Sequence, residues 1–339
     1  MEGKKSSLIL VLKVLEEYSD EEHFLTQQEI IDKIDETYGV SLERKSVANC
    51  ISLLQELDYD IVKGPHGGFA LFSRLFDPSE VQYITDALFS AKSISAKHAE
   101  EIANRAQSTL SKHQKKKYNY IHKATQMSRT DSKEVFYAID TVHEGIRRGK
   151  RISFQLRCFD EHGRPSLRMD GYRYKVSPYY LINSNGYYYL LCNYREKYAP
   201  FNIFRVDFMT DLQIEEDWPI KPIEALKDVK DFDIAKYVNE HIYMLGGDTV
   251  DAVLRIERVS GIQALKDWFG SHAKIKEKEG VLYASIKCNE KALLYWLLQY
   301  GEEFTLLEPS STIDKLKAYL KIQVDKYGDL PDLPVFYPN

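Results

Sequence analysis

The chain has 339 residues, of which 44% are hydrophobic and 29% charged, as in an ordinary globular protein. Its length exceeds the needs of one compact core and predicts two or three domains. The formal net charge is −5, so an anionic partner would have to be bound by a local cationic region. No run of about 18 apolar residues occurs, and we expect a cytoplasmic protein with neither a signal peptide nor a membrane span.

The N-terminal part of the chain has the pattern of three helices followed by a hairpin. Apolar residues at helical spacing predict a helix over residues 6–18. Thr26, with Glu29 three residues later, makes a capping box at the start of a second helix that stops at Gly39. Ser41 is expected to cap a third helix, and a Gly-Pro-His-Gly-Gly turn then joins two short strands. This order is typical of a winged helix-turn-helix, whose third helix enters the DNA major groove.

Charge in this head leaves two interpretations open. Residues 1–75 contain eight Lys/Arg and 14 Asp/Glu, a net charge of −6, whereas phosphate contacts normally dominate affinity for duplex DNA. The acids gather at the first helix corner and along the second helix, which leaves cations on the third helix and the hairpin. We expect DNA binding strengthened by dimerisation; the alternative is a small α+β module of other purpose. The candidate DNA contacts are Arg44, Lys45, Ser46, Asn49, Lys63 and His66.

A helical spacer follows the head. Asp77 and Ser79 can cap one helix, and a second helix is predicted over residues 96–113. The basic run at residues 115–117 is expected to be a solvated helix end.

The middle of the chain concentrates aromatic rings and cations. Nine of the 24 tyrosines lie between Tyr172 and Tyr198, and residues 145–205 hold 12 Lys/Arg against four acids, a net charge of +8. Rings that stack on bases, set among cations that hold phosphates, are typical of a nucleic-acid or nucleotide site. An ordinary tyrosine-rich sheet is the alternative, because tyrosine is also a good strand residue. After an amphipathic helix at residues 133–150, short alternating strands predict a small barrel of about five strands.

The last third of the chain has a different order of predicted strands and helices. Residues 219–248 form a charged connector with prolines, which ends at Gly246-Gly247. From residue 249 the pattern is strand, helix, hairpin, helix, strand and a last helix, an order typical of a ferredoxin-like layer.

Catalytic and metal-binding signatures are missing from the sequence. It has no GxxxxGK phosphate loop, no GxGxxG after a strand, no GxSxG and no HExxH. The four cysteines are far apart, and none has Cys or His neighbours at metal-ligand spacing. We therefore expect a protein that is not an enzyme and that needs no cofactor.

Three short motifs follow one another in the tyrosine-rich region. Residues 176–181 read Val-Ser-Pro-Tyr-Tyr-Leu, residues 188–190 read Tyr-Tyr-Leu, and residues 204–207 read Phe-Arg-Val-Asp. In this order they resemble the proline-centred strand, the naming tripeptide and the later signature of bacterial WYL-domain transcriptional regulators. Tyrosine replaces the first tryptophan of the tripeptide, and Phe208-Met209 stand where the family often has arginine and isoleucine. The resemblance covers nearly the whole chain, because residues 296–301 and 307–309 also match the family's C-terminal extension.

The resemblance implies an SH3-like barrel with a polar, cationic pocket that senses nucleotides or nucleic-acid fragments and signals to the head. Tyr189 and Arg205 carry over from the matched motifs. Arg195 follows the tripeptide strand, where the family commonly has a basic residue. The candidate effector-binding residues are Tyr189, Arg195 and Arg205, together with Ser177, Lys175 and Tyr179 beside the matched proline.

Elementary physical chemistry adds two expectations to the resemblance. Tyr187 and Tyr189 share one face of a strand and Tyr188 takes the other, so one set packs in the core. A buried arginine without an acid is costly, so Arg205 should pair with Asp207, with another acid or with a ligand.

The sequence as a whole predicts an α+β multidomain regulator. It would bind double-stranded DNA as a homodimer and respond to a nucleotide or single-stranded nucleic-acid effector. The alternative is a module that binds single-stranded nucleic acid and uses its head for protein contacts. The expected parts are residues 1–76 (winged helix-turn-helix), 77–132 (spacer), 133–218 (WYL barrel), 219–248 (connector) and 249–339 (ferredoxin-like extension).

Overall fold

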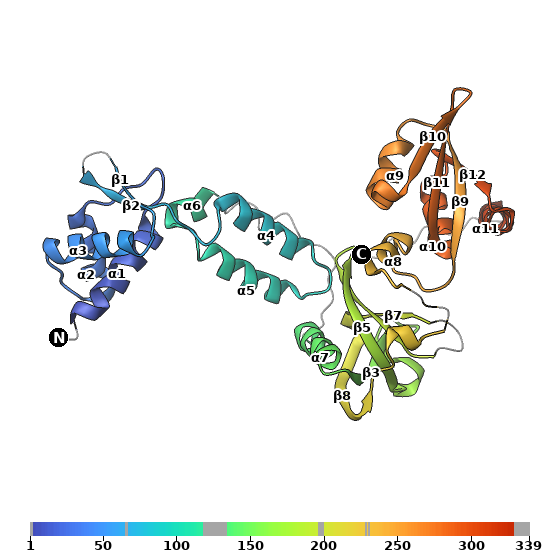
Figure 1. Ribbon diagram of the computed structural model, residues 1–339, viewed down its shortest axis with the longest axis horizontal. Helices are drawn as coiled ribbons and strands as arrows, with labels where there is room; N and C mark the ends of the chain where they lie inside the picture. The colour runs from blue at the N-terminus through green and yellow to red at the C-terminus, as the bar shows by residue number, and fades with distance from the viewer. Residues whose placement is uncertain are drawn as a thin grey trace. The chain divides into compact units, whose positions relative to one another are not determined.

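The computed structural model divides into two compact units, Met1–Lys133 and Glu134–Asn339, and each is described here by itself (Figure 1). His66, an expected DNA contact, lies outside the described residues, as do residues 118–132 of the expected spacer. The residues that the structure describes are 3–64, 67–117, 134–195, 200–227, 229 and 231–328.

The first unit opens with the predicted order of three helices and a hairpin. These elements are α1 (Gly3–Tyr18), α2 (Gln27–Tyr38), α3 (Arg44–Glu56), β1 (Ile61–Lys63) and β2 (Phe69–Leu71). The two strands pair antiparallel. One buried apolar cluster joins all five elements, since it holds residues such as Leu15, Ile30, Leu54, Ile61 and Leu71.

Helix caps in the head agree with the sequence at one position and differ at another. Thr26 and Glu29 form the predicted reciprocal capping box at the start of α2, and Gly39 ends this helix in the left-handed conformation. Ser41 does not cap α3, because the chain stays extended through Glu43, the residue at the N-cap. The helix therefore begins at Arg44.

Three further helices complete the described part of this unit: α4 (Pro78–Ser90), α5 (Ala96–Gln107) and α6 (Lys112–Lys117). Helices α4 and α5 lie side by side (Figure 1). The helix predicted over residues 96–113 is wrong, since the structure has two helices with a break between them. Ser111 Oγ accepts a hydrogen bond from the Gln114 backbone N–H and so provides a new helix start.

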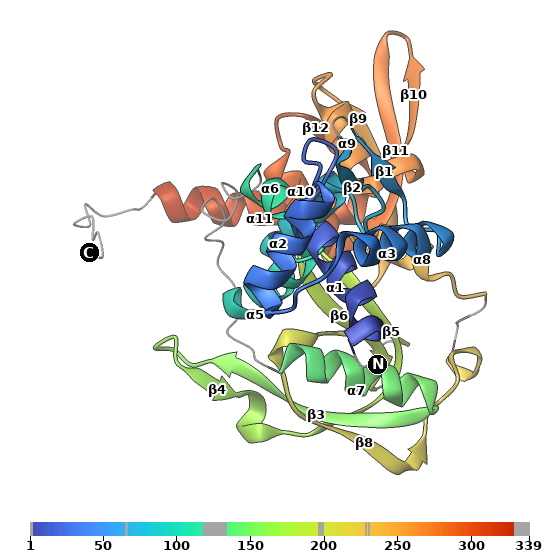
Figure 2. The same ribbon diagram turned by 90° about the vertical axis from the view of Figure 1, so that its left-hand side faces the viewer.

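The second unit begins with a helix packed on a curled antiparallel sheet. The elements are α7 (Val135–Arg147), β3 (Lys150–Phe159), β4 (Pro165–Leu167), β5 (Tyr174–Ser184), β6 (Tyr187–Asn193), β7 (Asn202–Arg205) and β8 (Met209–Pro219). In the described chain this sheet has six strands, in the order β4-β3-β5-β6-β7 with β8 paired to β3. Helix α7 covers β3 and β8 (Figure 2), and its Val142 packs with Ile152, Phe154 and Leu190 in the core.

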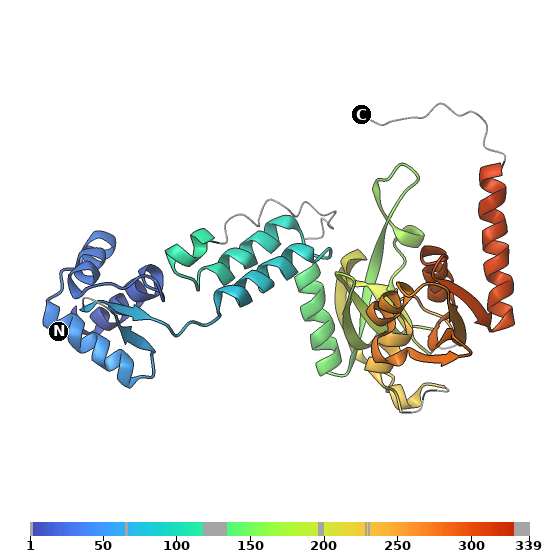
Figure 3. The same cartoon turned by 90° about the horizontal axis from the view of Figure 1, so that it is seen from above.

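The remaining residues form a second layered part with its own core. A connector helix, α8 (Ile234–Glu240), precedes it; the sequence had suggested only a charged connector there. The elements are β9 (Thr249–Ile256), α9 (Gly261–Phe269), β10 (Lys274–Lys278), β11 (Val281–Asn289), α10 (Glu290–Gln299), β12 (Phe304–Glu308) and α11 (Ser310–Gly328). This is the predicted order, and the antiparallel sheet runs β10-β11-β9-β12. Trp296 and Phe269 fill its core, and α11 is a single long helix (Figure 3).

The protein is thus a mixed α and β protein, built from helices and curled antiparallel sheets. No described helix is both long and apolar enough to cross a lipid bilayer.

Candidate functional site

Arg205 is held on the outer face of β7 by an acid and two aromatic rings. Its Nε donates to Asp207 Oδ1 at 3.1 Å, and its Nη2 donates to Asp207 Oδ2 at 2.6 Å. The guanidinium carbon lies 3.7 Å from the centre of the Tyr187 ring and 4.4 Å from that of Phe208. Burial alone would lower the pKa of Arg205, but the hydrogen bonds to Asp207 and its charge raise the pKa overall. The expected pairing with Asp207 is therefore present.

Tyr189 lies directly across the strand pair from Arg205. Strand alternation puts Tyr188 against the core between α7 and the curled sheet, whereas Tyr189 packs on the opposite side with a second cluster that contains Tyr179 and Phe201. Burial raises the pKa of the Tyr189 hydroxyl, which is therefore neutral near pH 7. The face that carries Arg205, Tyr187 and Tyr189 combines a cation with flat rings.

Ser177 and Tyr179 have structural partners. The buried Ser177 Oγ accepts a hydrogen bond from the backbone N–H of Lys221 at 3.0 Å. The Tyr179 hydroxyl donates to the carbonyl oxygen of the same residue at 2.7 Å. These two bonds fasten the start of the connector to β5.

Lys175 and Arg195 have other neighbours. Lys175 is exposed on β5, and its Nζ lies 2.9 Å from Glu215 Oε2. Arg195 is exposed beyond the end of β6, where its Nη2 lies 3.5 Å from the Tyr172 hydroxyl. Its guanidinium also lies 5.0 Å from the centre of the Tyr194 ring.

The structure brings Tyr189 and Arg205 together and ties the other four effector candidates to different neighbours. It also shows that much of the positive charge counted over residues 145–205 is neutralised. The acids responsible lie just outside that stretch of sequence. Glu144 is on α7, Glu134 precedes α7, and the others lie between residues 207 and 216. The ion pairs are Arg147–Glu144, Arg148–Glu216, Arg157–Glu134, Arg173–Asp211, Lys175–Glu215 and Arg205–Asp207.

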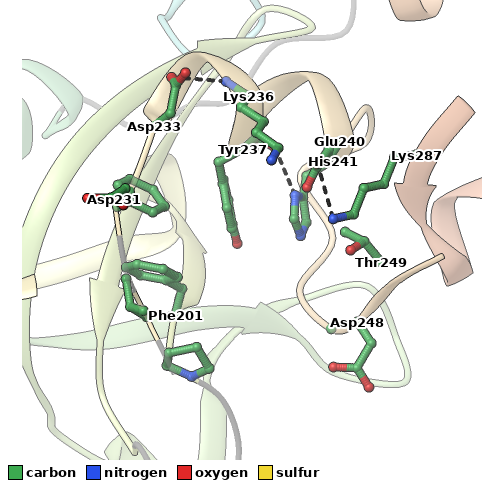
Figure 4. Close-up of a pocket in the computed structure, with 14 residues that line it drawn as sticks. Phe201, Asp231, Asp233, Lys236, Tyr237, Glu240, His241, Asp248, Thr249 and Lys287 are labelled. Atoms are coloured by element: carbon green, nitrogen blue, oxygen red, sulfur yellow. Dashed lines mark hydrogen bonds and ion pairs between the residues drawn. The ribbon is translucent and has the colours of Figure 1, made fainter. Parts of the chain in front are cut away.

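A pocket of about 440 Å³ lies where the first sheet of the second unit, the connector and the last sheet meet (Figure 4). Tyr237 lies on α8 and His241 follows directly after this helix, one turn further on. Their rings stack with centres 3.9 Å apart. Figure 4 shows the Tyr237 side chain reaching into the middle of the pocket, and within the described chain its hydroxyl has no hydrogen-bond partner. Lys287 Nζ lies 3.8 Å from Glu240 Oε1 at the pocket wall.

The chemistry of this pocket differs from the expected cationic socket. Four carboxylates and two lysines line it, and burial lowers the pKa of His241, so this imidazole is neutral near pH 7. Such a lining suits a neutral or cationic polar ligand better than an anion. Sequence reasoning missed the pocket because its wall is α8, which lies within the charged connector. The carboxylates are Asp231, Asp233, Glu240 and Asp248, and the lysines are Lys236 and Lys287.

The head presents its predicted DNA contacts around the start of α3. Arg44, Lys45 and Asn49 are exposed, and Ser46 is partly exposed. The Arg44 Nη2 donates to Gln28 Oε1 at 3.1 Å, which links α3 to α2. A hollow of about 320 Å³ brings Arg44 and Lys63 into one lining, together with the first residues of α2 and with Phe69.

Comparisons with known proteins identify one domain. Residues 137–214 match the model of the WYL domain, a range that covers most of α7 and the sheet from β3 into β8. No curated protein matches the chain. Among solved structures, it is similar to "Proteasome accessory factor B/C (PafBC) of Arthrobacter aurescens" (15% identity, TM-score 0.30), covering 95% of this chain. The present chain covers 49% of the PafBC chain and therefore spans about half of that protein's length. It is also similar to "Crystal structure of a CRISPR Cas-related protein" (15% identity, TM-score 0.38, 96% of this chain and 84% of that chain).

Proposed function

We propose that the protein is a nucleic-acid-binding transcription regulator. Its head would bind double-stranded DNA as a winged helix-turn-helix, and its WYL domain would sense an anionic effector. The WYL match over residues 137–214, behind a module of three helices and a hairpin, is the observation that carries this function. In this proposal the barrel is SH3-like and the C-terminal layer is ferredoxin-like, which agrees with the strand order β10-β11-β9-β12.

The DNA-binding surface would be the exposed start of α3. Lys45 and Asn49 lie one turn apart on this helix, at the end that a recognition helix points into the major groove. Arg44 and Lys63 line one hollow, where their two positive charges would hold a backbone phosphate. A homodimer would contact two half-sites, and this avidity would offset the head's net charge of −6.

The effector would lie on the face that carries Arg205, Tyr187 and Tyr189. An arginine has five N–H donors, and Asp207 accepts from two of the guanidinium nitrogens, Nε and Nη2. The side chain is 30% exposed, so its remaining donors are within reach of a phosphate while Asp207 keeps its orientation. A base could stack on the neighbouring tyrosine rings. Binding would shift the population between two placements of the heads.

A gel-shift series with duplex DNA at rising salt tests the DNA-binding half of this function. We expect the logarithm of the binding constant to fall steeply and linearly with the logarithm of salt concentration, because counterions are released from phosphates. Native mass spectrometry of freshly purified protein tests the effector half, with a co-purified nucleotide or oligonucleotide as the expected result. Absence of duplex binding at low salt would contradict the proposed regulator.

The acidic head favours one competing function, a single-stranded nucleic-acid module whose head contacts proteins. The same gel shift separates the two when a single strand of matched length competes with the duplex. A regulator keeps its duplex bound, whereas the competing module releases the duplex and retains the single strand.

A further inference from the structure

A second pocket, of about 630 Å³, lies in the first unit, where the corner between α1 and α2 meets α6. Its volume is within the range of small-molecule sites, about 300–1,000 Å³. Unlike the pocket in Figure 4, it has more lysines than carboxylates in its lining: four lysines and two glutamates, beside two histidine rings. These residues are Lys33, Lys112, Lys115, Lys116, His23, His113, Glu22 and Glu29.

Both glutamates already have partners. Both carboxylate oxygens of Glu22 accept hydrogen bonds from Lys117 Nζ at 3.0 Å. Glu29 is the reciprocal partner in the capping box of Thr26, and the hydrogen bonds from that residue lower the pKa of Glu29. Neither carboxylate forms an ion pair with a lysine of the pocket, although the charge of Lys33 also lowers the pKa of Glu29.

Three of the four lysines have no close carboxylate partner among the described residues. Lys112 pairs with Glu17 at 2.7 Å. Throughout the described chain, by contrast, Lys33, Lys115 and Lys116 form no ion pair with a carboxylate. Removing an ammonium group from water without pairing it with an anion costs free energy, so the pocket favours an anionic occupant.

Lys115 shows this cost directly. Burial lowers the pKa of its ammonium group; the charge of Glu17 raises the pKa in part, and those of Lys112 and Arg74 lower it further, so that the pKa is lowered overall. A bound phosphate would reverse these effects, because it supplies the opposite charge at close range. The basic run at 115–117, expected to be a solvated helix end, is thus partly built into a pocket wall.

Flat rings line the same space. His23 and His113 stack with centres 3.6 Å apart and planes 9° apart. The Lys33 and Lys112 ammonium groups lie 4.3 and 4.2 Å from the centre of the Tyr18 ring. Cations set beside aromatic faces fit a ligand that joins phosphate groups to a flat heteroaromatic body.

The pocket walls are fixed by hydrogen bonds between α6 and the head. The buried Asp20 accepts from Ser111 Oγ at 2.5 Å and contacts His23 Nδ1 at 2.6 Å. Gln114 Nε2 donates to Glu21 Oε2 at 3.3 Å. The lysines of α6 therefore face the head in a set position, which lowers the entropy that a ligand would lose.

We propose that this pocket binds a free phosphate-bearing ligand of nucleotide size, with its phosphates held by Lys33, Lys115 and Lys116. Such a ligand would bridge α6 to the head and stiffen the base of the DNA-binding module. The site is separate from the effector face around Arg205, so it goes beyond the function proposed above and does not depend on it.

Calorimetric titration of the full-length chain with ATP and with tripolyphosphate, without metal ions and at low salt, tests this site. We expect one saturable event that becomes at least tenfold weaker in Lys115→Gln/Lys116→Gln. Lys276→Gln/Lys278→Gln removes the same charge from the exposed strand β10 and should bind as the parent does. Lys115→Arg/Lys116→Arg keeps the charge and should bind within severalfold of the parent.

Two further arms separate this site from its neighbours. Arg205→Gln should leave ATP binding intact, because Arg205 is not part of this pocket. If this variant no longer bound ATP, the ATP would lie in the WYL domain and the proposal would be overturned. Lys115→Gln/Lys116→Gln is also titrated with duplex DNA. If its DNA binding has a lower salt slope than that of the parent, and the parent does not bind ATP, these lysines are DNA backbone contacts and the proposal is likewise overturned. Parent-like ATP binding by Lys115→Gln/Lys116→Gln would refute the pocket assignment.

Discussion

Arg205 and Asp207 form a two-point ion pair in which the carboxylate is 1% exposed and the guanidinium 30%. The pair therefore has a structural role as well as the proposed effector role. Arg205→Ala leaves a buried carboxylate without its partner, which costs about 3–5 kcal/mol for a fully buried pair. Because one member is partly hydrated, we expect a smaller loss, about 1–3 kcal/mol of unfolding free energy.

Urea unfolding followed by tryptophan fluorescence measures this loss in the second unit alone, because Trp218, Trp268 and Trp296 all lie there. The double variant Arg205→Ala/Asp207→Ala is the control, since it removes the stranded charge. We expect it to be more stable than the single Arg205→Ala variant. Equal losses in the two would show that the unpaired Asp207 carboxylate costs no stability. Effector binding is best tested with Arg205→Lys, which keeps a positive charge beside Asp207.

Gly145 gives a prediction about the packing between α7 and β3. A Cβ atom at this position would lie 2.6 Å from Cγ2 of Ile152, a side chain that is 0% exposed and has no room to move. Gly145→Ala should gain up to about 1 kcal/mol of helix propensity and lose about 1–3 kcal/mol to overpacking. We expect a net destabilisation of about 1–2 kcal/mol, read from the same fluorescence signal.

Gly246→Ala is the matched control, because a Cβ there meets nothing within 4 Å and the backbone is not left-handed. Its stability should stay within about 0.5 kcal/mol of the parent. A Gly145→Ala variant as stable as this control would mean that α7 can move away from the sheet.

Local patterns predicted much of the fold because their causes are local. The capping box at Thr26 depends on residues three positions apart, and the opposite placement of Tyr188 and Tyr189 depends on alternation along one strand. The break before α6 has a local signal that the sequence reading overlooked, since Ser111 and Gln114 cap the new helix reciprocally. Ser111 Oγ also donates to Asp20, 91 residues away in sequence, and no local pattern shows that contact.

The candidate site was harder to predict, for the same reason. A charge count over residues 145–205 stops two positions before Asp207, and β8 then brings Asp211 to Arg173, just before β5, and Glu215 to Lys175 on β5. Strand pairing, not nearness in sequence, decides which charges meet. Three lysines that have no ion pair among the described residues line the pocket at α6, and two of them lie in a segment where the sequence indicated a solvated helix end.

The start of α3 carries the third prediction. Lys45→Ala should weaken duplex binding to a similar degree on all sequences and reduce the salt slope by about 1, as expected for one lost phosphate contact. Gel shifts at several salt concentrations measure both quantities. Lys97→Ala on α5 removes one charge from a side chain that is 86% exposed, and it should leave the slope unchanged. Identical slopes for parent and Lys45→Ala would place the DNA elsewhere on the protein.

His241 carries the last prediction, a dependence of stability on pH. The residue is 4% exposed; its Nδ1 lies 2.8 Å from the Tyr237 carbonyl oxygen, and burial lowers its pKa below the usual 6.5. The unfolded chain therefore binds the proton more tightly than the folded chain does. The stability that the neutral imidazole contributes is complete above about pH 6.5 and is lost as the pH falls below that value.

We expect the second unit to unfold at lower urea concentration at pH 5.5 than at pH 7.5, with a slope from this group of at most about 1.4 kcal/mol per pH unit. His241→Gln changes the overall stability as well, so the slope with pH is the informative quantity, and it should become shallower. His272→Gln makes the same change at an exposed position and should keep the parent's slope. A parent-like slope in His241→Gln would mean that water reaches this imidazole and that the wall of the pocket in Figure 4 opens as it titrates.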